Sequence, residues 1–200
     1  FSELMISPDE LTTGDDVTVS VDITDNGKID SASVTLHWTE NKKQNTAGMK
    51  LTSGDTYSVT VTLADSTSQF SCYVTAKDDA GHMSSSESVS LSVSDDDPPI
   101  IKDVGASATT GDPYLISASI TDNYYVSNVT MAWSQDETGE EDIYLEDEEG
   151  EGLYSYWVEP SLTSTSPLLY TYTAYDDAGN EATLSGTVTV TDNDAPVFGT

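Results

Sequence analysis

The sequence predicts an all-β protein made of two tandem antiparallel β-sandwiches. Three observations indicate this fold class. Apolar and polar residues alternate over many short segments, no segment keeps a helical period across three turns, and the pattern repeats after 97 residues. Gly, Asp, Asn and Ser separate the segments, so we expect antiparallel strands joined by turns and almost no helix.

The repeat is visible when the sequence is aligned with itself. Thr13-Gly14-Asp15 aligns with Thr110-Gly111-Asp112, and Tyr57 aligns with Tyr154. Trp38 aligns with Trp133 after a slip of one or two residues. Such slips belong in loops, so the two copies are expected to share one fold.

Acidic linkers mark the boundaries between copies. The segment 95–100 matches the segment 192–197 in its aspartates and its proline. We therefore expect one repeat over 1–97, a second over 98–195, and the first residues of a third over 196–200. This organisation predicts that the chain is a piece of a longer array.

Each expected strand has one apolar face. A period of two places every second side chain on the same face of a sheet, and that face is expected to be buried. In the first copy the apolar positions are, strand by strand, Val17, Val19, Val21 and Ile23; Val34, Leu36 and Trp38; Tyr57, Val59, Val61 and Leu63; Phe70, Cys72, Val74 and Ala76; and Val89, Leu91 and Val93.

The charge balance excludes several partners. The chain has 36 Asp and Glu against 6 Lys and Arg, a formal net charge of -30. Phosphate backbones and anionic membranes repel such a polyanion, so we expect cations as partners and no nucleic acid. No apolar run approaches the roughly 20 residues that span a bilayer, so we expect no direct membrane insertion by this segment.

One acidic run distinguishes the second copy. The stretch 136–151 contains ten acidic residues, whereas the corresponding region of the first copy carries Lys42, Lys43 and Lys50. We interpret the run as a surface insertion that folds as an exposed ribbon between acidic turns. A solvated acidic face, a further cation site and a salt-adapted surface all remain open for it.

The sequence gives little support for an enzyme. His37 is expected on the outer face of a strand and His82 in a loop, and neither has a plausible nucleophile beside it. Cys72 is expected to be a small core residue. Paired carboxylates can hydrolyse glycosides, but aspartates that recur in both copies favour a structural role. We therefore expect no catalytic residues.

Several of these residues resemble those of known domains. Trp38 and Trp133 on the third strand, and Cys72 without a cysteine opposite, resemble an immunoglobulin-type (Ig-like) sandwich that lacks its disulfide. Fibronectin type III and cadherin domains share that architecture. The tail 191–198 resembles the cadherin inter-repeat linker, and the segment 175–180 looks like the loop before the last strand in Ig-like repeats of microbial surface proteins.

Strand parity predicts where the carboxylates gather. In a seven-stranded sandwich the chain enters at the end that carries the loops after the second and sixth strands. Repulsion would open such a cluster unless cations bound there, and hard oxygen ligands without His or Cys select Ca²⁺. We expect Asp97, Asp122 and Asp176 as direct ligands. Asp95, Asp96 and Asp177 are expected to ligate or screen.

Further acidic groups are candidates for weaker sites. The matching end of the first copy has Asp25, Asp78 and Asp79, but its incoming linker is missing. Asp192 and Asp194 follow the second copy and lack the downstream domain that would complete a site with them. The alternative remains that all these carboxylates are solvated turn residues, because Asp and Asn favour turns. Asn128-Val129-Thr130 is a glycosylation sequon, which makes Asn128 a candidate for modification.

The resemblance implies an extracellular structural role. We expect a module of a cell-surface array, such as a surface-layer protein, stalk or adhesin of a microbial cell wall, archaeal cells included. Its linkers are expected to be rigidified by calcium, and its partners to be adjacent repeats or neighbouring copies. The alternative is a ligand- or carbohydrate-binding adhesion module. Its binding surface would use the exposed tyrosines Tyr124, Tyr125, Tyr144 and Tyr156.

Overall fold

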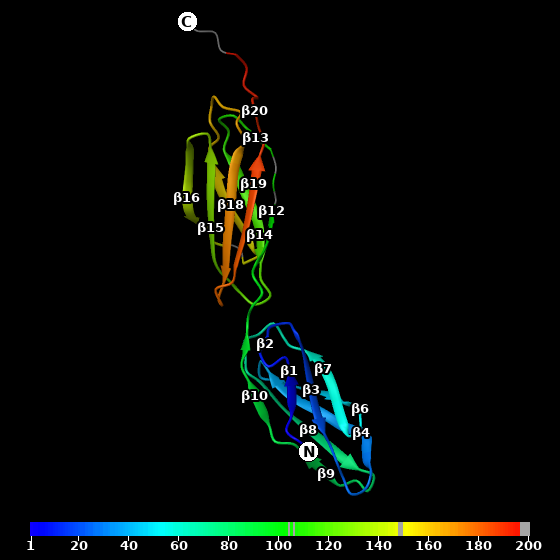
Figure 1. Ribbon diagram of the computed structural model, residues 1–200. Helices are drawn as coiled ribbons and strands as arrows, with labels where there is room; N and C mark the ends of the chain where they lie inside the picture. The colour runs from blue at the N-terminus through cyan, green and yellow to red at the C-terminus, as the bar shows by residue number, and fades with distance from the viewer. Residues whose placement is uncertain (104, 106, 148–149, 197–200) are drawn as a thin grey trace. The chain divides into compact units, whose positions relative to one another are not determined.

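The computed structural model describes residues 1–103, 105, 107–147 and 150–196, and the chain divides into two compact units, Phe1–Asp96 and Asp97–Thr200 (Figure 1). None of the described residues is helical, and each unit is an Ig-like antiparallel β-sandwich. The prediction of the fold class is therefore confirmed. Residues 197–200, expected to belong to a third repeat, lie outside the described residues, so that expectation stays a prediction.

The first unit pairs a four-stranded sheet, in the order β1-β3-β7-β6, with a sheet in the order β10-β8-β4-β5, to which β9 adds beside β8. A short parallel pair, β2 and β11, closes one side. The strands are β1 (Met5–Ser7), β2 (Leu11–Thr12), β3 (Asp16–Asp22), β4 (Ile29–Glu40), β5 (Lys43–Gly48), β6 (Lys50–Ser53), β7 (Thr56–Thr62), β8 (Phe70–Asp78), β9 (Met83–Ser85), β10 (Val89–Leu91) and β11 (Val93–Ser94).

The second unit repeats this plan, with sheets of three and four strands where the first unit has four and five. Figure 1 shows β16, β15, β18 and β19 side by side, and the facing sheet has the order β12-β14-β17. The parallel pair is β13 with β20. The strands are β12 (Ile100–Asp103), β13 (Ala108–Thr109), β14 (Tyr114–Thr121), β15 (Val126–Gln135), β16 (Thr138–Tyr144), β17 (Leu153–Val158), β18 (Leu168–Asp176), β19 (Glu181–Val188) and β20 (Val190–Thr191).

Each core is built from the inward faces of the two sheets. In β3 the residues Val17, Val19 and Val21 are fully buried, and polar residues between them face outward. In β18 Tyr170, Tyr172 and Ala174 take the same role. Alternation with period two therefore placed the core faces correctly, and burial of these side chains provides the main favourable free energy of folding.

The acidic run of the second unit is a replacement and not an insertion. Its central part is β16, which pairs with β15 as β5 pairs with β4 in the first unit. Most of its side chains are exposed. The expectation of an exposed ribbon is confirmed, but the two units have a strand at this position, so the interpretation as an insertion is wrong. What differs is the charge of the strand and the loop that follows it.

Among the residues that the structure describes, there is no helix long and apolar enough to cross a membrane.

Candidate metal centre

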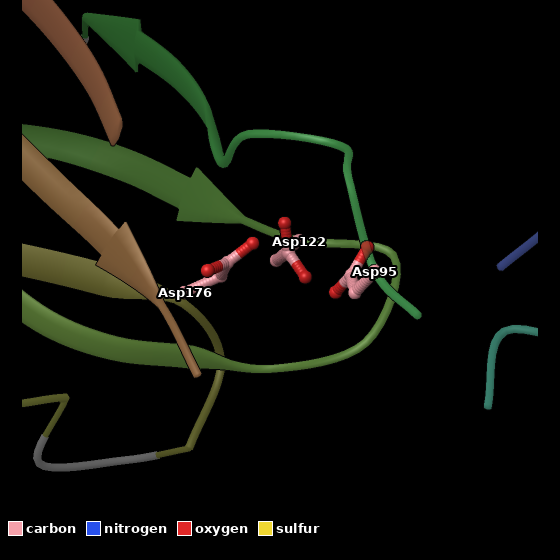
Figure 2. Close-up of side chains that lie close together, drawn as sticks. All are labelled: Asp95, Asp122 and Asp176. Carbon is pink, nitrogen blue, oxygen red and sulfur yellow. The ribbon is translucent and has the colours of Figure 1, made fainter. Parts of the chain in front are cut away.

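Three aspartates from distant parts of the sequence form an acidic cluster. Asp95 lies in the connecting segment, Asp122 follows β14, and Asp176 ends β18. Each offers a carboxylate oxygen, and these oxygens all lie within 4.8 Å of one another. Figure 2 shows the three carboxylates directed toward one another. Asp95 and Asp176 are almost fully buried, with 6% and 2% of their surface exposed.

A tight turn after β18 fixes Asp176. Its Oδ1 accepts hydrogen bonds from the backbone N–H groups of Gly179 and Asn180, at 2.6 and 2.8 Å, and its Oδ2 accepts one from Asn180 Nδ2. Gly179 has φ +93°, a conformation that glycine adopts without steric strain. The sequence Asp-Asp-Ala-Gly-Asn therefore presents the first carboxylate rigidly at the end of the strand.

Asp122 is held from one side only. Its Oδ2 accepts hydrogen bonds from the backbone N–H groups of Tyr124 and Tyr125, at 2.8 and 2.9 Å. Its Oδ1 is buried and accepts no hydrogen bond from the described residues. A buried oxygen of this kind costs free energy unless another group or an ion satisfies it.

Thr13 positions the carboxylate of the connecting segment. Its hydroxyl, itself fully buried, donates to Asp95 Oδ1 at 2.8 Å. The backbone N–H of Thr13 bonds to the carbonyl of Ser94, which continues the pairing of β2 with β11. The second unit repeats the arrangement, because Thr110 Oγ1 bonds to Asp192 Oδ1 at 3.4 Å.

The anchoring role of these threonines was missed in the sequence. Thr13-Gly14-Asp15 and Thr110-Gly111-Asp112 served only to align the repeats. The signal was present, because a threonine at an equivalent position of both copies, followed by an aspartate after the last strand, fits a hydrogen bond between them. Periodicity alone does not reveal a contact across more than 80 residues.

Electrostatic repulsion within the acidic cluster is substantial. Two unit charges 4.8 Å apart repel by about 3.5 kcal/mol at an effective dielectric constant of about 20. Salt screens the repulsion poorly because two of the three aspartates, Asp95 and Asp176, are buried. The second unit contains a single basic residue, Lys102, which lies in β12 with Ser119 of β14 as its register partner.

The other expected ligands of this end take different positions. Asp97, expected as a direct ligand, accepts a hydrogen bond from Asn123 Nδ2 at 2.9 Å, and the linker's member of the cluster is Asp95 instead. Asp96 and Asp177 are exposed. The cluster therefore contains two of the three residues expected as direct ligands, together with one that was expected to ligate or screen.

At the matching end of the first unit, basic side chains lie beside two of the aspartates. His82 Nδ1 lies 2.8 Å from Asp78 Oδ2, and Lys28 Nζ lies 3.8 Å from Asp79 Oδ2. Asp25 Oδ2 accepts a hydrogen bond from the backbone N–H of Gly27. Lys28 thus offsets part of the negative charge at this end, and His82 does so when it is protonated.

The carboxylates that follow the second unit lie at its opposite end. Asp192 and Asp194 both lie 3.4 Å from Thr110 Oγ1, and both are exposed. Asn193 Nδ2 donates to Asp112 Oδ2 at 3.0 Å. They stand where Asp95 and its neighbours stand after the first unit, and their ligation of an ion stays a prediction.

The residues weighed for catalysis are in structural positions. His37 Nε2 lies 3.0 Å from Thr75 Oγ1, and its ring stacks on Tyr73 with centroids 4.8 Å apart. Cys72 is fully buried, and burial raises the pKa of its thiol to about 11. A buried thiol with that pKa is a poor nucleophile.

The sequon and the exposed tyrosines occupy separate surfaces. Asn128 is half-buried in β15 beside the inward-facing Val129. Tyr124 and Tyr125 are exposed in the loop after β14, whereas Tyr144 ends β16. Tyr156 is half-buried in β17 and donates its hydroxyl to Glu140 Oε2. Tyr144 and Tyr156 line one groove of the second unit, whereas Tyr124 and Tyr125 are not among its lining residues.

The chemistry of the acidic cluster fits a hard divalent cation. It offers oxygen ligands, a net negative charge and no nitrogen or sulfur donor among its three members. Ca²⁺ takes six to eight oxygen ligands from carboxylates, carbonyls and water in irregular geometry. Three carboxylates can supply part of such a shell, with water completing it.

Comparison with solved structures finds similarity to several chains of tandem modules, all at TM-scores below 0.5. The fibronectin(III)-like modules of Clostridium thermocellum CbhA are 13% identical, with 99% of this chain and 100% of that chain covered and a TM-score of 0.36. The ectodomain of mouse nectin-like molecule 4 is 17% identical over 98% of this chain and 66% of that one, with a TM-score of 0.41. Titin domains A168–A170 are 12% identical over 96% and 67%, with a TM-score of 0.47.

These likenesses concern the β-sandwich fold alone, because the identities and scores are too low to say anything of ligand or activity. A comparison with protein-family models finds no match, and neither does one with curated proteins.

Proposed function

We propose that this chain is a structural module of an extracellular cell-surface array, in which Ca²⁺ bound at the acidic cluster rigidifies the linker that leads into the second unit. The array would be a surface layer, a stalk or an adhesin of a microbial cell, archaeal cells included. Its partners are adjacent repeats and neighbouring copies of the protein. Its work is spacing and assembly and not catalysis.

The observation that carries this proposal is the acidic cluster. Three carboxylates gather within 4.8 Å, and Asp122 Oδ1 is buried without a hydrogen bond from the described residues. Without a counter-ion the arrangement is repulsive. A bound Ca²⁺ would remove the repulsion and satisfy the buried oxygen, and it would tie Asp95 of the linker to the loops of the second unit.

Calcium titration of the purified chain tests the proposal. We expect one site, at the acidic cluster, with a dissociation constant in the roughly 0.1–1 mM range typical of extracellular modules. Asp122→Asn should weaken the affinity by about tenfold or more. The same substitution should leave the ion-free protein as stable as the wild type or more stable. It replaces the charge of Asp122, which repels Asp95 and Asp176, by a neutral amide that can donate hydrogen bonds to them.

Asp79→Asn is the matched control. It removes the same charge from an exposed carboxylate of the first unit, which pairs with Lys28. Calcium affinity should change little in this variant. An unaltered affinity in Asp122→Asn, or no calcium heat at 10 mM, would reject the site.

A second candidate function is an adhesion module that binds a ligand. It is favoured by an open groove of about 740 Å³ in the second unit, beside which Tyr144 and Trp157 expose 74% and 63% of their surface. Exposed aromatic rings of this kind stack on sugars or on cationic side chains. Screening of the chain against immobilised glycans tests the carbohydrate form of this candidate.

A further inference from the structure

The two units differ at one edge of the sandwich. In the first unit, Met49 is buried and its N–H bonds to the carbonyl of Val34, after which the chain forms β6 along β7. In the second unit, Leu145 is buried and bonds in the same way to Val129. The residues that follow Leu145 do not form a strand in the part of the chain that the structure describes.

One side chain, Asp147, accepts several backbone hydrogen bonds in the segment between Leu145 and β17. Asp147 accepts hydrogen bonds from the backbone N–H groups of Gly150, Glu151 and Gly152, at 3.0, 3.1 and 2.8 Å. These bonds hold Gly150, Glu151 and Gly152 against Asp147, whereas the first unit forms the hairpin of β6 and β7 here. Within the described residues β17 consequently pairs with β14 alone, and its other edge is open.

The groove of about 740 Å³ lies along this open edge. Leu153, Ser155 and Trp157 of β17 line it, together with Tyr144 and Glu146. Leu153 and Ser155 correspond, at the offset of 97, to Thr56 and Ser58 of β7, which pair with β6. The groove therefore takes the place of the missing strand.

We infer that the open edge of β17 binds an extended basic peptide, which adds as a strand in the position that β6 occupies in the first unit. An unpaired strand edge offers backbone N–H and C=O groups to such a peptide. This inference specifies the ligand class of the second candidate function, and it is independent of the calcium site.

The charge of the surroundings selects a basic peptide. Ten acidic residues lie between 136 and 151, and Glu146 is part of the groove itself. Trp157 and Tyr144 can hold a cationic head group over their rings and the alkyl stem of a lysine against them. The strand that fills the equivalent place in the first unit begins with Lys50 and Leu51, and Lys50 pairs with Ser58. A second copy of this acidic surface would be repelled.

The test is a binding measurement on the full chain with an acetylated octapeptide of alternating Lys and Val. We expect binding at 50 mM salt that weakens at least about tenfold at 500 mM, and chemical-shift changes in the amides of Leu153–Val158. The same peptide with Glu in place of Lys should not bind. Two further peptides carry N-methyl groups on all Val or on all Lys amides, and at least one of them should lose about tenfold in affinity, because one set of amides faces β17.

Protein variants locate the site. Trp157→Ala and Tyr144→Ala should each weaken binding about five- to tenfold, and both side chains are exposed enough for the fold to survive. Leu169→Ala, at an exposed position of β18, is the matched control and should bind as the wild type does. Glu146→Gln should weaken binding, whereas Glu87→Gln in the first unit should not.

Other outcomes separate this inference from the candidate on which it rests. Binding of a neutral glucose hexasaccharide that is lost in Trp157→Ala, with no peptide binding, would overturn the peptide but keep an adhesion module. No binding of either probe would overturn both. Equal affinity for the methylated peptides would overturn strand addition.

Discussion

One residue, in the turn after β8 of the first unit and after β18 of the second, distinguishes the acidic ends of the two units. Asp176 and Asp78 begin equivalent turns, but the residue four positions later is Asn180 in the second unit and His82 in the first. Asn180 adds a neutral amide to Asp176, whereas His82 adds a group that can carry charge. Protonation of His82 can thus offset the charge of Asp78 in the first unit. Asn180 of the second unit cannot be protonated in this way.

The pair of His82 and Asp78 predicts a pH dependence. The hydrogen bond that His82 donates to Asp78, and then the charge of Asp78, raise the pKa of His82 above its ordinary value of 6.5, and the same hydrogen bond lowers the pKa of Asp78 below 3.8. A raised histidine pKa stabilises the fold below about pH 6.5, and this contribution is lost as the pH rises through the folded pKa. A lowered carboxyl pKa contributes above about pH 3.8 and is lost as the pH falls through its folded value.

The pair is therefore expected to stabilise the first unit most between about pH 4 and 6.5. NMR titration of the His82 ring should give a pKa above 6.5 in the wild type and a lower one in Asp78→Asn. Asp79→Asn keeps the hydrogen bond and is the control. A His82 pKa that is the same in Asp78→Asn and in the wild type would contradict the pairing.

At the scale of strands, a glycine in β19 makes room for a ring that connects the two sheets. Gly186 is the register partner of Tyr170, and a Cβ added to it would lie 2.1 Å from the Tyr170 hydroxyl oxygen. Tyr170 donates that hydroxyl to Asp103 of the facing sheet, and burial together with this bond raises its pKa. The ring could not keep this position beside any larger residue.

Gly186→Ala is accordingly expected to destabilise the second unit by about 1–3 kcal/mol, the usual cost of overpacking. Urea denaturation measures the change. Gly48→Ala in β5 is the matched control, because a Cβ there meets no atom within 4 Å. A Gly186→Ala variant as stable as Gly48→Ala would show that Tyr170 has an alternative position.

The sequence predicted strand faces well and connections between strands less well. Alternation fixes which side chains are buried, so the core of β3 and of β8 followed from it. Alternation did not predict which aspartate of the linker joins the acidic cluster. Thr13 holds Asp95 by a hydrogen bond, and no local pattern specifies that bond. Alternation also did not predict that the described residues form no strand on the other side of β17, where three backbone N–H groups bond to Asp147.

At the scale of the whole molecule, the net charge of -30 makes general salt effects and specific ion binding easy to confuse. Monovalent salt shortens the screening length from about 10 Å at 0.1 M to about 3 Å at 1 M and so relieves repulsion everywhere. A calcium site acts at millimolar concentration and through a few residues only. The two effects therefore differ in concentration and in their response to one substitution.

We expect 1 M NaCl to raise the melting temperature of the wild type and of Asp122→Asn alike. Calcium at 2 mM and constant ionic strength should raise it in the wild type alone, by mass action on the folded state. Small-angle scattering should show a narrower distribution of interatomic distances on adding calcium, again in the wild type only. If calcium affects both proteins equally, the ion acts only by screening charge. The aspartates at the linker are then ordinary solvated turn residues, and calcium does not stiffen the linker.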